Sequence, residues 1–231
     1  MENSREVKII RNYYDTPTPL FESETFTFIE GLNVIVGCNG SGKSTLLRQI
    51  TRDGNIKPKF SYDNYLEGGR NAIEKMDFLG DTSGIISRAM ASEGENIKMN
   101  LGKFIQGLKI FIHSPEVDSK ERWILLDAVD SGLSIDGIEE LKRVINLVIR
   151  DSQSLGLKTY IIASSNSYTL AEGSYCIDIR NGKPIRFDSY EQYRRFILDT
   201  HEYKLKRYEA NKKIEEKESR VRKRMIRGER I

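Results

Sequence analysis

The stretch GCNGSGKST, from Gly37 to Thr45, decides the fold of this chain. It matches the phosphate-binding pattern G-x-x-x-x-G-K-[ST], with Gly37, Gly42, Lys43 and Ser44 at the fixed positions. A glycine-rich turn lets consecutive backbone N–H groups converge on one phosphate, and a helix that begins there points its positive end at the same place. The stretch therefore predicts a phosphate site.

The sequence on both sides of this loop fits such a site. The apolar, β-branched run at residues 32–37 predicts a buried strand before the loop, and residues 45–50 continue as an amphipathic helix. We expect Lys43 to bind the β- and γ-phosphates and the Ser44 hydroxyl to coordinate Mg²⁺. The rest of the loop supplies the other expected nucleotide ligands, which are Asn39, Gly40, Ser41, Gly42 and Thr45.

Further strands and helices alternate along the chain. Strands are predicted at residues 7–10, 25–30, 123–127, 159–164 and 175–179, and helices at residues 93–112, at residues 137–155 and from residue 190 towards the C-terminus. Little regular structure is predicted over residues 52–84. Beyond residue 209 the apolar positions of the last helix are too few for a buried face.

Charge is distributed unevenly over the 231 residues. The net charge is +3, but residues 200–231 hold twelve Lys or Arg and six Glu, so the rest of the chain is net acidic. We therefore divide the chain into a domain at residues 1–199 and a basic helical tail at residues 200–231. The tail is expected to bind a partner protein or nucleic acid and to be separate from the nucleotide site.

The cysteines and the hydropathy pattern bear on the compartment. Cys38 and Cys176 are the two cysteines, and a disulfide at Cys38 would disrupt the phosphate loop, so a reducing cytoplasm is expected. The sequence has no N-terminal apolar leader and no long apolar run. We therefore predict a cytoplasmic protein without membrane insertion.

Three more motifs follow the phosphate loop. The strand at residues 123–127 delivers Asp127, a carboxylate placed to hold Mg²⁺. SGLS follows at residues 131–134, and SEGEN stands at a helix start, at residues 92–96. Taken in chain order, the phosphate loop, SEGEN, the strand ending in Asp127 and SGLS resemble the P-loop, signature, Walker B and D-loop of ABC- and SMC-type ATPases. The resemblance covers about residues 7–186. The resemblance implies an α/β P-loop NTPase of ABC-ATPase type, with a mixed central sheet flanked by helices and, here, a basic C-terminal helix.

The resemblance also implies cofactors and partners. In that family two subunits sandwich two ATP molecules, and the signature of one subunit contacts the γ-phosphate bound to the other. Here the signature residues are Ser92, Gly94 and Glu95. The cofactors implied are ATP and Mg²⁺, and the assembly implied is a homodimer or a hetero-assembly through the ATP sandwich.

The groups expected to hydrolyse ATP depart from the family pattern. Ala128 stands where a catalytic glutamate normally follows the Walker B aspartate, either naturally or as an engineered replacement. Asp130 lies two residues further on, and Ser165, with Asn166 adjacent, stands where the switch histidine is expected. We therefore assign the remaining catalytic roles to Asp127, Asp130 and Ser165.

Several residues have two interpretations. Ser92 and Glu95 also spell a helix capping box. Tyr14 lies where an adenine-stacking aromatic is expected, and Arg11 is a similar nucleotide-binding candidate, but both also fit structural roles. Asn64 is a weak candidate for the glutamine of the Q-loop, and the segment between Lys43 and the signature is short for a transporter ATPase.

Three functions remain open at this stage. The first is an ATP-gated dimerising switch with slow or partner-dependent hydrolysis, in DNA metabolism or a defence complex by analogy with the family. The second is the ATPase subunit of a membrane transporter. The third is a non-hydrolysing scaffold in which the bound nucleotide is structural.

Overall fold

The computed structural model describes residues 4–14, 16–64, 93–114 and 119–226. Its centre is a six-stranded sheet with the strand order β4-β5-β6-β3-β7-β8. The strands are β3 (Gly31–Val36), β4 (Lys59–Asp63), β5 (Glu121–Asp127), β6 (Lys158–Ser164), β7 (Tyr175–Asp178) and β8 (Pro184–Ile185). All neighbouring pairs are parallel except β7 and β8, so the sheet is mixed.

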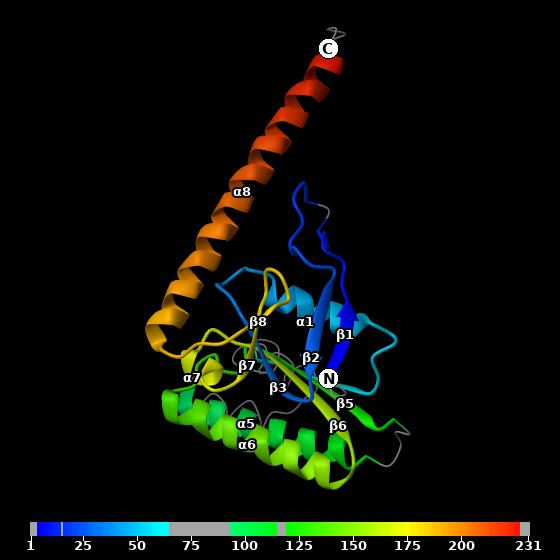
Figure 1. Ribbon diagram of the computed structural model, residues 1–231, viewed down its shortest axis with the longest axis vertical. Coiled ribbons are helices and arrows are strands. Elements are labelled where there is room, and N and C mark those ends of the chain that lie inside the picture. The colour runs from blue at the N-terminus through cyan, green and yellow to red at the C-terminus, as the bar shows by residue number, and fades with distance from the viewer. Residues whose placement is uncertain (1–3, 15, 65–92, 115–118, 227–231) are drawn as a thin grey trace, which may run out of the picture.

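Each face of this sheet is covered by a different layer (Figure 1). The helices α5 (Glu93–Ile112), α6 (Ile135–Ser154) and α7 (Tyr168–Ala171) lie on one face. The other face carries α1 (Lys43–Arg52) and a two-stranded antiparallel sheet of β1 (Ser4–Lys8) and β2 (Thr25–Ile29). The long helix α8 (Tyr190–Ile226) packs on the domain near its start and then extends beyond it.

Alternation along β5 shows how the sequence builds both layers. Ile124 and Leu126 point into the core beneath α5 and α6, whereas Trp123 and Leu125 point into the core beneath α1. All four side chains are at most 2% exposed. A strand buried on both faces reads as a continuous apolar run, as it does here, because both neighbours in the sheet and both layers exclude water.

The strand order gathers the predicted motifs at one edge of the sheet. β5, β6 and β3 are adjacent and parallel, so Asp127, Ser164 and the loop after Val36 all lie at carboxyl ends of strands. Ligands of open α/β sheets bind at this edge. The strand that carries Asp127 is separated from the loop strand by β6, which leaves room between them for a ligand.

The predicted fold class is confirmed, with differences in detail. The predicted strands over residues 25–30, 32–37, 123–127, 159–164 and 175–179 correspond to β2, β3, β5, β6 and β7, and helix α5 has the predicted bounds. The first strand was expected at residues 7–10 but lies at Ser4–Lys8, because its register follows from pairing with β2. α6 begins at Ile135, two residues before the predicted start.

Strand β4, helix α7 and strand β8 were not predicted from the sequence, and β4 is the longest of the three. It pairs in parallel with β5, and its Phe60 and Tyr62 side chains pack against Phe104 of α5. The alternating aromatic residues in KFSYD were the available signal. β4 is short and lies at the sheet edge, with most of its residues partly exposed, so the local pattern is weak.

The helices of the described residues do not include one that is both long and apolar enough to cross a membrane.

The turn between β7 and β8 gives a stability test. Gly182 has φ +71°, and a β-carbon there would lie 2.8 Å from the Thr25 carbonyl oxygen, whereas Gly156 has φ +68° and open space around it. We expect Gly156→Ala to lose about 1 kcal/mol of unfolding free energy from the left-handed backbone alone. Gly182→Ala should lose roughly 1–3 kcal/mol more, because the added methyl group meets backbone.

Urea unfolding of the wild type and both variants measures this difference. Equal losses in the two variants would show that the β7–β8 turn moves away from β2 without resistance.

Candidate nucleotide-binding site

The phosphate loop has the backbone geometry that its sequence predicts. Gly40 and Gly42 have φ values of +72° and +106°, in the left-handed region that favours glycine. A β-carbon on Gly42 would lie 3.1 Å from side-chain atoms of both Leu20 and Phe21. Gly42 is the N-cap of α1, so the free N–H groups of the first helical turn face the loop. This arrangement fits an anion at the helix N-terminus.

Lys43 is the buried cation at the centre of the site. It is 8% exposed, and its Nζ donates hydrogen bonds to the Gly37 carbonyl oxygen (2.7 Å), the Cys38 carbonyl oxygen (3.1 Å) and Asn166 Oδ1 (2.8 Å). Burial lowers the pKa of Lys43 from 10.5 to about 8, although nearby acidic groups oppose the shift. The protein thus holds an ammonium group in a site that disfavours its charge, and an incoming anion would remove that penalty.

A pocket of about 530 Å³ opens beside Lys43. The phosphate loop and α1 supply one wall, with Asn39, Gly40, Gly42, Lys43, Ser44, Thr45 and Arg48. The segments after β5 and β6 supply a second wall, with Asp127, Ala128, Ser164 and Asn166. Tyr14, Leu20 and Arg207 complete the lining. Loop, strand ends and a terminal helix therefore meet around one cavity.

Asp127 is held at the end of β5 by the neighbouring strand. The Ser164 hydroxyl donates a hydrogen bond to Asp127 Oδ1 and accepts one from the Ala128 N–H at 2.9 Å. Ala128 has φ +50°, and no other non-glycine residue of the described ranges has a positive φ. A left-handed alanine costs about 1 kcal/mol, so the backbone is strained at the position where the resemblance led us to expect a glutamate.

A second polar network connects Asp130 to the phosphate loop. Asp130 Oδ2 accepts hydrogen bonds from Ser165 Oγ (2.7 Å) and from the Asn166 N–H (3.1 Å). The Asn166 side chain then accepts from Lys43 and donates to Asn39 Oδ1 at 2.7 Å. Asp130 therefore positions Asn166, whose side chain accepts a hydrogen bond from the Lys43 ammonium. The spacing of these residues in the sequence did not reveal this connection.

Of three further predicted nucleotide ligands, Tyr14 lines the pocket, whereas Ser41 and Arg11 do not. The Tyr14 hydroxyl hydrogen-bonds Thr45 Oγ1 at 3.0 Å, and both residues line the pocket. Ser41 turns its hydroxyl back towards Gly37, where an added β-carbon would lie 2.8 Å from Oγ, and it does not line the pocket. Arg11 donates to the Phe21 carbonyl oxygen and is not among the lining residues.

The signature motif is only partly described by the structure. Ser92 lies outside the described residues, and Gly94 and Glu95 lie in the first turn of α5. Asn64, the weak candidate after β4, donates a hydrogen bond to the Ser131 carbonyl oxygen at 2.8 Å. It therefore connects the segment after β4 to the D-loop-like stretch.

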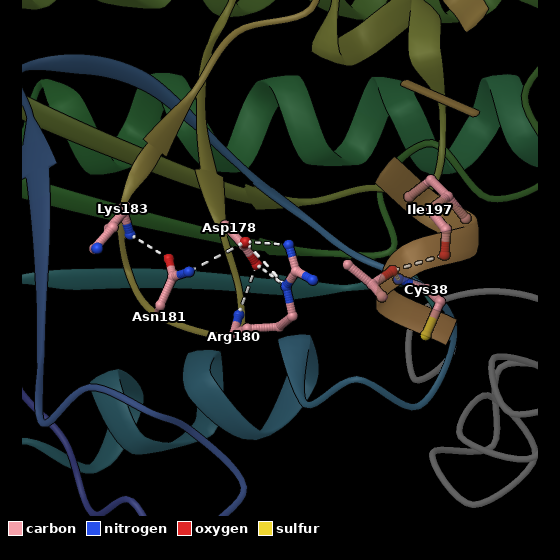
Figure 2. Close-up of polar contacts among 7 residues, drawn as sticks. Cys38, Asp178, Arg180, Asn181, Lys183 and Ile197 are labelled. Carbon is pink, nitrogen blue, oxygen red and sulfur yellow. Dashed lines mark hydrogen bonds and ion pairs between the residues drawn. The ribbon is translucent and has the colours of Figure 1, made fainter. Parts of the chain in front are cut away.

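Helix α8 makes contacts with the phosphate loop that the sequence analysis did not anticipate. The Cys38 N–H donates to Thr200 Oγ1 at 2.9 Å, and Figure 2 shows Cys38 beside Ile197 of this helix. Lys204 Nζ donates to the Asn39 carbonyl oxygen at 2.9 Å. The available signal in the sequence was the spacing of four residues between the polar Thr200 and Lys204, because this spacing places both on one helix face.

An ion pair anchors the same helix to the sheet. Arg180 bonds Asp178 at 2.7 Å (Figure 2), and its guanidinium lies 5.2 Å from the ring centre of Phe196 and 6.0 Å from that of Tyr203, both on α8. The hydrogen bond to Asp178 raises the pKa of Arg180. The first part of α8 is thus fixed against the end of β7, which lies beside β3 in the sheet.

The site fits a nucleotide with Mg²⁺ by its donor set. Within the described residues there is no cluster of three or more His, Cys, Asp or Glu that could bind a metal by itself. Mg²⁺ is usually held by few protein oxygens together with substrate phosphates and water. Ser44 and Asp127 both line the pocket, and their side chains carry oxygen atoms of that kind.

Comparison with known proteins gives a local sequence match. No protein-family model matches the chain. The chain is 41% identical over 54 residues to PF0068 of Pyrococcus furiosus, a protein named as an ABC transporter ATP-binding protein. The match spans 23% of this chain and about a fifth (20%) of that protein's length.

Comparison with solved structures gives a match to the ADP conformation of MJ1267, an ATP-binding cassette of an ABC transporter. The TM-score is 0.43 and the identity is 13%, over 86% of this chain and 98% of that chain.

The sequence match and the site geometry agree on one class of protein. The phosphate loop follows β3, Asp127 ends β5, and β6 lies between these strands. The local identity to an ATP-binding protein and this arrangement of a phosphate loop and a strand-end carboxylate both point to a nucleotide site of P-loop type.

The lowered pKa of Lys43 predicts how nucleotide binding depends on pH. The ammonium is mostly charged at pH 7 and mostly neutral at pH 9, because its pKa is about 8. Phosphate binding needs the charged form, so ATP affinity should fall about tenfold between pH 7 and pH 9. Lys43→Ala should bind ATP about ten- to hundred-fold more weakly at pH 7 and should lose most of this pH dependence.

Titration of both proteins with a fluorescent ATP analogue at several pH values measures the effect. A Lys43→Ala variant with wild-type affinity would refute the phosphate-loop assignment, and one with the wild-type pH dependence would assign the titration to another group.

Proposed function

We propose that this protein is an ATP- and Mg²⁺-binding ATPase of ABC/SMC-like type that acts as an ATP-gated switch with slow or partner-dependent hydrolysis. The observation that carries the proposal is the pocket in which Lys43, Ser44 and Asp127 meet while Ala128 takes the place of the catalytic base. This composition favours binding over turnover. DNA metabolism or a defence complex is the setting proposed by analogy with the family.

The contacts of Lys43 support nucleotide binding. Its Nζ donates hydrogen bonds to two loop carbonyl oxygens and to Asn166 Oδ1. The β- and γ-phosphates would replace part of this set and supply a charge-assisted partner. Ser44 and Asp127 would hold Mg²⁺, which neutralises phosphate charge when it is bound.

Slow hydrolysis follows from the residues after β5. Ala128 has no proton acceptor, and it lines the pocket where the attacking water would need one. Asp130 is the nearest alternative in sequence, but one of its carboxylate oxygens already accepts two hydrogen bonds, from Ser165 and Asn166. We therefore assign Asp130 and Ser165 first to positioning the Asn166 segment.

Assembly and partner binding are the remaining parts of the proposal. The signature at Ser92, Gly94 and Glu95 would complete the site of a second subunit, as a homodimer or a hetero-assembly. Residues 1–199 would form the ATPase domain, and the basic tail at residues 200–231 would recruit a partner protein or nucleic acid. Side chains of residues 212–220 on the tail are exposed, which leaves them available for such contacts.

The name of the Pyrococcus furiosus relative favours a second candidate, the ATPase subunit of a membrane transporter. Purification from the native cell distinguishes this candidate, because a transporter ATPase would co-purify with a membrane subunit.

The third candidate is a non-hydrolysing scaffold, and the strained Ala128 at the base position is the observation that favours it. Measured turnover of ATP separates the scaffold from the switch.

Ala128 is the position at which hydrolysis can be tested. We expect Ala128→Glu to raise ATP turnover, because a missing general base typically lowers the rate by ~10²–10⁴-fold. Ala128→Gly is the matched control, since it relieves the positive φ without adding a base and should leave turnover unchanged. Release of inorganic phosphate under saturating ATP measures all three proteins.

Asp130→Asn completes this test. If turnover stays flat in Ala128→Glu but is abolished in Asp130→Asn, then Asp130 is the general base and the assignment of position 128 is wrong.

The signature motif predicts assembly that depends on the γ-phosphate. ATP should drive dimerisation and ADP should not, because Ser92 and Gly94 would contact the phosphate that ADP lacks. Ser92→Arg places a long side chain where the phosphate must approach, so it should abolish the dimer and leave monomeric ATP binding intact. Sedimentation of both proteins with ATP and with ADP measures the outcome. A wild type that stays monomeric at saturating ATP would reduce SEGEN to a helix cap.

A further inference from the structure

One face of α8 carries a row of polar side chains along the phosphate pocket. Thr200, Lys204, Arg207 and Asn211 are spaced by four, three and four residues, which places them on the same side of the helix. The first two contact the phosphate loop through the backbone of Cys38 and Asn39, as described above. The row therefore begins at the phosphate loop and continues to Arg207, which lines the pocket.

The second half of this row contacts the loop before β2. Arg207 Nη1 donates to the Pro19 carbonyl oxygen at 3.4 Å, and Asn211 Oδ1 accepts from the Thr18 N–H at 2.8 Å and from the Thr18 hydroxyl at 2.6 Å. All these partners are neutral. The helix is thus fixed by polar contacts to both loops. The two cations of the row, Lys204 and Arg207, are held in place between Thr200 and Asn211.

Both cations lie close enough to the pocket to attract an anion bound there. Arg207 lines the same cavity as Lys43 and Ser44. Lys204 Nζ is 3.8 Å from the position of a β-carbon on Gly40, at the tip of the phosphate loop. Burial is the main cause of the lowered pKa of Lys43, and the charge of Lys204 lowers it further, so the two ammonium groups interact.

Within the described residues, Lys204 and Arg207 differ from a neighbouring lysine of the same helix in their pairing. Among the residues that the structure describes, neither side chain forms an ion pair with a carboxylate, whereas Lys206 on the opposite side of the helix pairs with Glu202 at 2.7 Å. Like charges gathered around a phosphate loop repel one another, and a bound polyanion offsets this repulsion. The pocket therefore has more positive charge than Lys43 alone supplies.

We propose that Lys204 and Arg207 are nucleotide-binding residues, so that residues 200–211 of α8 form part of the polyphosphate site, and the exposed stretch beyond them is left for the partner contact proposed above. The chemical class of ligand is a nucleoside triphosphate, whose phosphates Lys204 and Arg207 attract together with Lys43. Thr200 and Asn211 position the helix on the two loops. This inference rests on the proposed function, because it extends the same site.

The test is a double variant, Lys204→Gln with Arg207→Gln, in the full-length chain. Its matched control is Lys212→Gln with Lys213→Gln, which removes the same charge from exposed positions about two turns further along α8. ATP affinity of the first variant should fall about ten- to hundred-fold, the loss expected for charged hydrogen bonds, and the control should stay close to wild type.

Binding of ADP and AMP provides a readout that a purely structural role would not change. If the two cations attract phosphates, the loss of affinity should decrease from ATP to ADP to AMP, because the ligand charge decreases. A loss that is equal for all three nucleotides would overturn the proposal, since it would indicate a damaged loop. The charge-keeping variant Lys204→Arg with Arg207→Lys should retain affinity within about threefold of wild type.

The possible outcomes separate this inference from the proposed function. If the wild type shows no ATP binding that depends on Lys43, the proposed function fails and the inference fails with it. If ATP binding depends on Lys43 but the double variant binds like its control, only the inference is overturned. If the double variant does not fold, Arg207→Gln alone decides, because its 3.4 Å contact is the weakest of the row.

Discussion

The burial of the Lys43 ammonium is the constraint on which the rest of the site depends. A buried charge needs hydrogen-bond acceptors, and here they come from the loop itself and from Asn166, which follows a different strand. Asn166 is in turn held by Asp130. One cation therefore ties the segments after β3, β5 and β6 into a single polar network. The lowered pKa shows that this network only partly offsets the desolvation, and the remaining penalty favours an anionic ligand.

The order of the strands explains why this network forms at one edge. β6 lies between β3 and β5, so Ser164 at its end lies within reach of Asp127 on one side, while Asn166 contacts the phosphate loop on the other. The flanking layers supply the rigid frame, because the strands are apolar on both faces and pack against helices and the β1–β2 sheet. The strained backbone at Ala128 sits within this frame, as strained residues do at functional sites.

The agreement between prediction and structure follows the range of the interactions involved. The phosphate loop, α5 and the buried strands are encoded by neighbouring residues, so their patterns were sufficient. β4 was missed because its partners on β5 and α5 are about sixty and forty residues away and its own pattern is weak. Arg11 was placed near the nucleotide by its position in the sequence, whereas its side chain turns to Phe21 and lies away from the pocket.

Sequence alone determined the phosphate loop, the acidic end of β5 and the α/β class, because glycines, a lysine and apolar periodicity act locally. It also showed that position 128 has no acceptor side chain. Only the tertiary structure decided that Asn166 shares the Lys43 ammonium and that α8 lies along the pocket. These contacts join residues more than a hundred positions apart. They depend on how the sheet and the last helix pack, and polar contacts to backbone leave no hydrophobic periodicity in the sequence from which to predict them.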